Sequence, residues 1–159
     1  MTEDQQKVLS LIFTRQAKVG YRKLEVASLL KVLPELTPES FAQAIGFLTD
    51  DNKVETDKEN RTGFSQIPIS MTRLILTTWL EQGANFLDFD PKQDLGMVED
   101  YIERATTSDG PTISQNLRLA AGRVDMAVNI LAAQQKVELK GNSPVLPGFS
   151  FLLVNWHSK

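Results

Sequence analysis

The sequence predicts an α+β, mostly helical protein made of two similar units, each with three helices followed by a β-hairpin. Three observations lead to this prediction. Apolar residues recur at helical spacing along most of the chain, short alternating stretches flank turn-forming residues in each half, and a helix-strand pattern of the first half returns in the second. The apolar fraction of 42% can supply a packed core, and no run approaches the roughly 18 apolar residues of a membrane span.

Three helices are expected at the start of the chain. The first covers about residues 5–18, has its apolar residues on one side, and ends at Gly20. The second covers about residues 24–33 and is ended by Pro34. The third covers about residues 38–51, with Thr37 as its N-cap and a proline in the first helical position.

A β-hairpin is expected next. Residues 53–56 alternate like a strand, a run of charged and turn-forming residues follows, and residues 64–69 form the return strand. Pro68 indicates an edge strand, because proline has no N–H to donate to a neighbour. A further helix is then expected over residues 71–82, with Ser70 as its N-cap.

The second half is expected to repeat this order. Its predicted helices and strands cover 91–105, 112–121, 123–135, 136–139 and 149–155. Asp90 is the expected N-cap of the first of these helices, and Thr112 begins a capping-box pattern that opens the second. Gly122 is expected to end that second helix.

An internal repeat supports the two-unit prediction. Residues 44–55 align with residues 127–138 at a constant offset of 83, with identical Ala, Leu, Lys, Val and Glu. Chance similarity between two amphipathic helices would explain the helical part, but less easily a helix, strand, turn and strand in the same order. We therefore expect Leu48 and Leu131 to occupy equivalent buried sites. The predicted units are residues 1–70 and 91–159, joined by a helix and linker over residues 71–90.

Three helices followed by a hairpin make the sequence resemble the winged-helix superfamily, twice over. The resemblance covers nearly the whole chain as a pattern, without a family-specific motif. Two such units in one short acidic chain look like the tandem winged-helix subunits of larger assemblies, such as bacterial segregation and condensation protein B and the small subunits of the endosomal-sorting complexes. The resemblance implies a non-catalytic adaptor that acts through protein contacts. The alternative that it implies is a DNA-binding regulator, with a helix-turn-helix reading the major groove.

Residues for catalysis or metal binding are sparse. The chain has no cysteine, its one histidine is His157, and its glycines are isolated, so thiol catalysis, imidazole metal sites and phosphate loops find no support. Asp88, Asp90 and Asp94 are closely spaced, but Lys92 stands among them, which favours an acidic linker and helix cap over a calcium loop. We expect neither an enzyme nor a cofactor.

Charge placement bears on the DNA alternative. The net charge is −3, and the third helix of the first unit turns Glu39, Asp50 and Asp51 outward, where phosphates would be repelled. The third helix of the second unit is the better candidate. Its residues expected to face outward are Arg123, Asp125, Asn129, Gln134 and Gln135, and Lys140 lies on the hairpin that follows.

Two surfaces are candidate contact sites. Arg15, Lys18, Arg22, Lys23 and Lys31 form the one clearly basic stretch, which is either a solvated face or a site for an anion or an acidic partner. The first four of these are the candidate contact residues.

The second candidate surface is the apolar C-terminal strand. Strand alternation turns Leu152, Val154 and Trp156 to one side, opposite a set that closes the core. That outer set is covered within the chain or offered to a partner. We expect a cytoplasmic protein whose partner is another protein or a second copy, with nucleic acid as the second class and no membrane contact.

Overall fold

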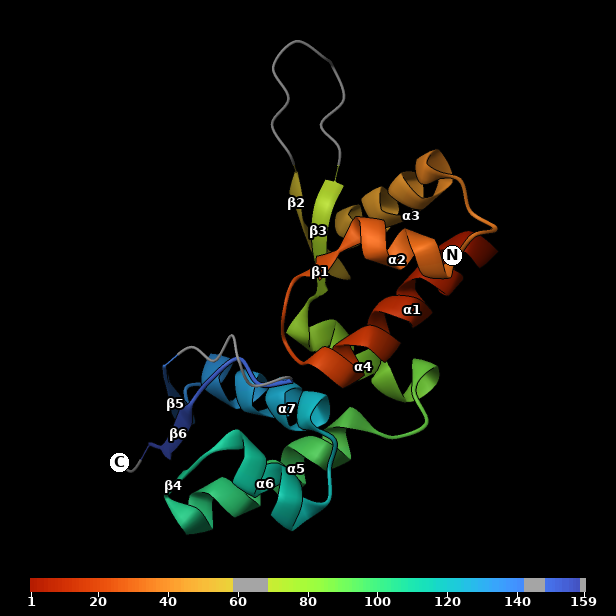
Figure 1. Ribbon diagram of the computed structural model, residues 1–159. Coiled ribbons are helices and arrows are strands. Elements are labelled where there is room, and N and C mark those ends of the chain that lie inside the picture. The colour runs from red at the N-terminus through yellow and green to blue at the C-terminus, as the bar shows by residue number, and fades with distance from the viewer. Residues whose placement is uncertain (59–68, 142–147, 158–159) are drawn as a thin grey trace.

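The computed structural model describes residues 1–58, 69–141 and 148–157 (Figure 1). The helices are α1 (Glu3–Val19), α2 (Val26–Val32), α3 (Pro38–Asp50), α4 (Leu76–Phe86), α5 (Pro91–Ala105), α6 (Gly110–Leu117) and α7 (Ala121–Ala133). The strands are β1 (Leu24–Glu25), β2 (Val54–Lys58), β3 (Ile69–Leu74), β4 (Thr107–Ser108), β5 (Val137–Lys140) and β6 (Leu153–Trp156). None of the described helices is both long and apolar enough to cross a membrane. These helices and strands make the chain α+β and mostly helical, as predicted.

The same element order occurs on either side of α4. Each half contains a helix, a two-residue strand, two helices and two further strands. The strands form two antiparallel three-stranded sheets, in the orders β1-β3-β2 and β4-β6-β5. In both sheets the last strand of the half, β3 or β6, lies in the middle. The short first strand pairs with one of its sides and the preceding long strand with the other. Figure 1 shows α4 between the two sets of elements.

The repeated segments have matching local structure. Both run from a helix into a strand, α3 into β2 and α7 into β5. Each turn contains one non-glycine residue with positive φ, Asn52 at 59° and Gln135 at 62°. In each, the following lysine donates its backbone N–H to the carbonyl of the core leucine, Leu48 or Leu131, at 2.9 Å. Both leucines are fully buried, which confirms their predicted burial.

The predicted helix caps are confirmed at three positions. The Thr37 hydroxyl accepts the N–H of Ser40, with proline at the start of α3. The Asp90 carboxylate accepts the N–H of Lys92 at the start of α5. Gly20 ends α1 with a φ of 82°, a conformation that glycine adopts without steric cost.

The helix predicted over residues 71–82 begins later than expected. Met71–Leu74 belong to β3, which pairs with β1 and β2, and α4 follows from Leu76. Within β3, Thr72 and Leu74 are buried while their neighbours are half-buried, so strand alternation decides this segment. The predicted return strand over 64–69 falls almost entirely outside the described residues, as does Pro68.

The second predicted helix of the second half is shifted toward the N-terminus. Asp109 is its N-cap, with the carboxylate accepting the N–H of Thr112, and the helix ends before Arg118 in the left-handed conformation. Gly122 does not end this helix but lies inside α7. A Cβ at Gly122 would overlap the Ala17 carbonyl of α1, so glycine permits the two helices to cross closely.

The C-terminal strand is shorter than predicted, and its faces differ from the prediction. It begins at Leu153, after a bend at Leu152 that breaks the alternation. Phe151 and Val154 are consequently both buried in the core, although Val154 was predicted on the outer face. Trp156 is half-buried and packs on the same core. β6 is also the middle strand of its sheet, where it pairs with β4 and β5.

One helix, α7, contributes to both hydrophobic cores. Met126 and Ile130 pack with the apolar residues of the N-terminal half, whereas Val124, Val128 and Leu131 pack within the C-terminal half. All side chains of residues 124–128 are buried as a result. Figure 1 shows α7 beneath α1, with α5 and α6 on its other side. The two halves therefore share a structural element instead of meeting only at their surfaces.

Candidate functional site

A buried glutamine fixes the turn that follows α1. The Gln16 side chain is fully buried, and its Nε2 donates to the backbone carbonyls of Gly20 at 2.5 Å and Arg22 at 3.2 Å. Its Oε1 accepts the N–H of Leu74 in β3 at 3.0 Å. Because one amide holds the helix end, the turn and the sheet, residues 20–23 have a defined position beside the last turns of α1.

A buried carboxylate joins this turn to the C-terminal half. Asp125 of α7 is fully buried and accepts the Tyr21 N–H at 2.6 Å, together with the Ser150 N–H at 2.7 Å and hydroxyl at 2.9 Å. The prediction that Asp125 faces outward is therefore wrong. Burial raises the pKa of Asp125, although these hydrogen bonds and the charge of Arg22 oppose the shift. Arg22 also donates to the Phe149 carbonyl.

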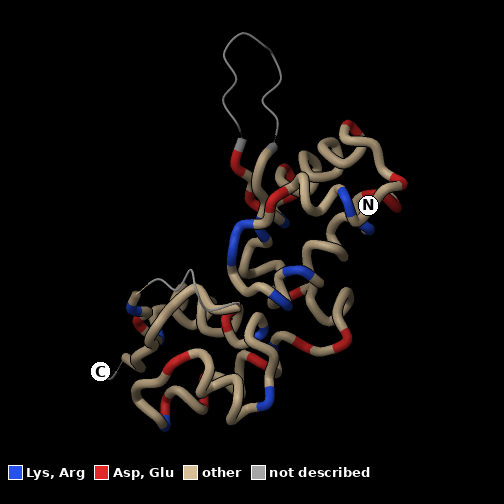
Figure 2. The backbone as a smooth tube through the Cα atoms, viewed as in Figure 1, with Lys and Arg blue, Asp and Glu red and all other residues tan. Residues whose placement is uncertain are grey.

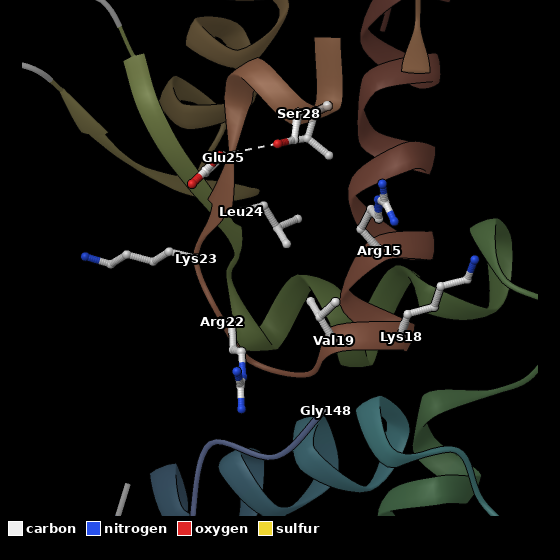
Figure 3. A pocket seen from close by; sticks show the side chains of 10 residues that line it. Arg15, Lys18, Val19, Arg22, Lys23, Leu24, Glu25, Ser28 and Gly148 are labelled. Carbon is white, nitrogen blue, oxygen red and sulfur yellow. Dashed lines mark hydrogen bonds between the residues drawn. The ribbon is translucent and has the colours of Figure 1, made fainter. Parts of the chain in front are cut away.

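These connections place four cations around an open pocket of about 480 Å³, here called the basic pocket (Figure 3). Its lining residues are Arg15, Lys18, Val19, Arg22, Lys23, Leu24, Glu25, Ser28, Leu29 and Gly148. Arg15 and Lys18 come from α1, whereas Arg22 and Lys23 come from the turn. Figure 3 shows Val19 and Leu24 between these two pairs of cations. Four of the five basic residues in the stretch that the sequence indicated thus line one pocket, whereas the exposed Lys31 is not among the lining residues.

The cations of the basic pocket differ in their partners. Lys23 forms an ion pair with Asp57 of β2 at 2.6 Å. Glu25 is the one carboxylate in the lining, and it accepts the Ser28 hydroxyl at 3.3 Å. Within the described ranges, Arg15 and Lys18 have neither a hydrogen bond nor an ion pair through their side chains. Figure 2 shows the basic residues along the end of α1 and the turn after it, where the two halves meet.

The residues predicted to read DNA are engaged inside the fold. Arg123 donates two hydrogen bonds to the buried Asp94 carboxylate, at 2.7 and 2.9 Å, and its guanidinium lies 3.7 Å from the Phe89 ring centroid. The hydrogen bond to Asp94 raises the pKa of Arg123. Asn129 donates its amide to the Ser150 hydroxyl at 3.0 Å. Both side chains therefore hold elements of the fold together.

The remaining predicted contact residues lie apart from the basic pocket. Lys140 is exposed at the end of β5. Leu152 is 47% exposed and its neighbour Leu153 is 43% exposed, so a small apolar surface remains at the start of β6 without Val154. Neither surface contains a residue that lines the pocket.

Two residues that organise the pocket were not predicted, although the sequence carries a signal for both. Gln16 falls on the apolar side of α1, and Asp125 lies in the apolar run of α7. A polar side chain at a core position indicates a buried hydrogen-bonding role.

Comparisons with protein-family models, curated proteins and solved structures found no match to this chain. Groups of three or more acidic or histidine side chains that could hold a metal are absent from the part of the chain that the structure describes.

Proposed function

We propose that this chain is a tandem winged-helix module that binds another protein and catalyses no reaction. The recurring order of a helix, a short strand, two helices and two further strands supports the winged-helix assignment, as does the same sheet order in both halves. Winged helices that bind DNA place the third helix of the unit in the major groove. The corresponding helices here are α3 and α7, so their surfaces bear on whether DNA or protein is the partner.

The observation that carries the proposal is the burial of α7. Residues 124–128 have no exposed side chain, because α1 covers one side and the C-terminal core covers the other. Arg123, at the start of this helix, is occupied by Asp94. A helix in this position cannot enter a groove without separating the two halves.

The surface of α3 favours protein over DNA for a different reason. Glu39 and Asp50 are exposed, and the helix contains no lysine or arginine. If α3 faced the DNA backbone, its carboxylates would be repelled by the phosphates. Phe47 is also 41% exposed on α3, and an exposed aromatic ring is a common anchor in protein interfaces.

The proposal is tested by identifying and then reconstituting the partner. The chain would be purified with a tag from cells that produce it, and co-purifying proteins would be identified by mass spectrometry. We expect one of them, purified separately, to form a stoichiometric complex in analytical ultracentrifugation. In parallel, selection from a random duplex DNA library should yield no motif. Recovery of a single motif, lost on Gln43→Ala in α3, would instead support the DNA-binding alternative.

A further inference from the structure

We propose that the basic pocket binds an acidic segment of the partner protein, with one apolar side chain on the pocket floor and carboxylates at the surrounding cations. This inference rests on the proposed function and names the chemistry of the partner. It is argued from the charges at the rim, the composition of the floor and the distribution of the cations.

The rim carries cationic charge that the fold does not use. Arg15 and Lys18 have no side-chain partner among the described residues, although the whole chain has a net charge of −3. In this acidic protein, four cations line the pocket against the single lining carboxylate of Glu25, so the pocket has a local excess of positive charge. Charge complementarity therefore selects an acidic ligand.

The floor is apolar. Val19, Leu24 and Leu29 line the pocket. Figure 3 shows Val19 and Leu24 between the two pairs of cations. Leu29 is almost fully buried, whereas Val19 keeps part of its surface accessible. A ligand that covered this floor with a polar group would lose hydrogen bonds to water without replacement. The ligand should consequently carry an aliphatic or aromatic side chain next to its acidic groups.

The distribution of the cations favours a peptide over a phosphate group. Phosphate sites converge several N–H donors on one point. Figure 3 shows instead that Lys18 and Lys23 extend in different directions from opposite sides of the floor. Glu25 also stands at the rim, as the N-cap residue of α2, where it would repel a compact dianion. Several carboxylates spaced along an extended chain can meet such separated cations individually.

Binding of a labelled peptide tests this inference. The probe is a short fluorescent peptide of Glu and Asp with one central Leu, measured by anisotropy at an ionic strength of about 0.15 M. The substitutions Arg15→Glu and Lys18→Glu together should weaken binding at least about tenfold. The matched control is Lys92→Glu with Lys140→Glu, which changes the net charge equally at two exposed residues outside the pocket. This control should weaken binding less than about twofold, since distant exposed charges are screened.

Further probes test the floor and the ligand class. Replacing the central Leu of the peptide by Ser should weaken binding at least about tenfold, because the aliphatic contact is lost. Inorganic phosphate and duplex DNA should displace the peptide only through general screening. The neutral pair Arg15→Gln and Lys18→Gln should cause a smaller loss than the charge reversal, and circular dichroism would verify that all variants remain folded.

Several outcomes would overturn the inference. One is the absence of saturable binding up to about 1 mM peptide. Equal losses of affinity in the pocket and control variants, or equal affinity of the Leu and Ser peptides, would also overturn it. So would stronger competition by phosphate or DNA than by unlabelled peptide. If the reconstituted partner complex forms unchanged with the pocket variant, the pocket inference fails while the protein-binding function stands. Recovery of a DNA motif would overturn the function itself.

Discussion

Single buried polar side chains connect segments of this protein that are distant in the sequence, and one of them, Asp125, connects its two halves. Asp125 accepts backbone N–H groups from Tyr21 of the N-terminal half and Ser150 of the C-terminal half. Gln16 connects α1, the following turn and β3 in a similar way. Buried polar groups with all their partners specify one arrangement of the surrounding segments, because any displacement leaves a group unsatisfied. Substitution of either side chain should therefore lower the free energy of unfolding, because several hydrogen bonds depend on each one.

The raised pKa of Asp125 predicts a pH-dependent contribution to stability. Since its folded-state pKa exceeds its unfolded-state value, proton uptake by this group favours the folded state. That stabilisation is complete below the unfolded pKa of about 4 and is lost as pH rises through the raised folded-state pKa. The free energy of unfolding of the wild type, relative to Asp125→Asn, should fall as pH rises from below about 4 through the raised folded-state pKa. Urea denaturation across this range measures it, and a constant difference would contradict the prediction.

The Arg123–Asp94 ion pair predicts a second effect on stability. Arg123→Ala should lower the free energy of unfolding by about 3 kcal/mol, because the nearly buried Asp94 carboxylate is left without its partner. Adding Asp94→Ala should restore part of that loss, since the unpaired charge is then removed. Chemical denaturation of the two single variants and the double variant provides the test. Additive losses would show that the pair does not interact energetically.

At the scale of elements, the close crossing of α1 and α7 depends on Gly122. Gly122→Ala should destabilise the protein by about 1–3 kcal/mol, because the new Cβ overlaps the Ala17 carbonyl and the helices must move apart. Gly46→Ala in α3 is the matched control, since no other atom lies within 4 Å of its added Cβ. That control should stabilise the helix by about 0.5–1 kcal/mol. Thermal melting of both variants compares them, and equal effects would refute the close-crossing explanation.

Helix boundaries followed from local sequence more reliably than strands did. Thr37 and Asp90 cap helices through their own side chains, so a few neighbouring residues suffice to predict them. Met71–Leu74 were expected to be helical, but they pair with β1 and β2. That pairing depends on residues distant in the sequence, which the local pattern does not reveal. The two-residue strands β1 and β4 went unpredicted for the same reason.

The candidate site was predictable in part. Arg15, Lys18, Arg22 and Lys23 are close in sequence, and a tight turn brings them to one pocket. The presence of Gly148 in the pocket lining could not be inferred, because it depends on the packing of α7 against α1. Arg123 was expected to be available for DNA, since its pairing with Asp94 requires knowledge of how α5 and α7 lie together. Tertiary contacts thus removed one predicted site and completed another.

At the scale of the whole molecule, the shared helix predicts cooperative unfolding. Leu48→Ala and Leu131→Ala lie in different cores, and each should cost about 2–5 kcal/mol from lost transfer energy and a cavity. Because α7 belongs to both cores, each substitution should shift one common transition. Denaturation followed by the fluorescence of Trp79 and Trp156 and by far-ultraviolet circular dichroism should give coincident curves. Two separate transitions, each sensitive to only one substitution, would show that the halves fold independently.

The position of α7 also determines when the N-terminal half can finish folding during synthesis. The ribosome releases α1, α3 and the first sheet before α7 emerges. Until then, the core of that half lacks Met126 and Ile130, and the apolar surface that they cover in the finished fold stays open to water. Nascent domains generally fold as units, N-terminal first. This nascent chain cannot complete its first core in that order, so its early half keeps apolar surface open to water until α7 arrives.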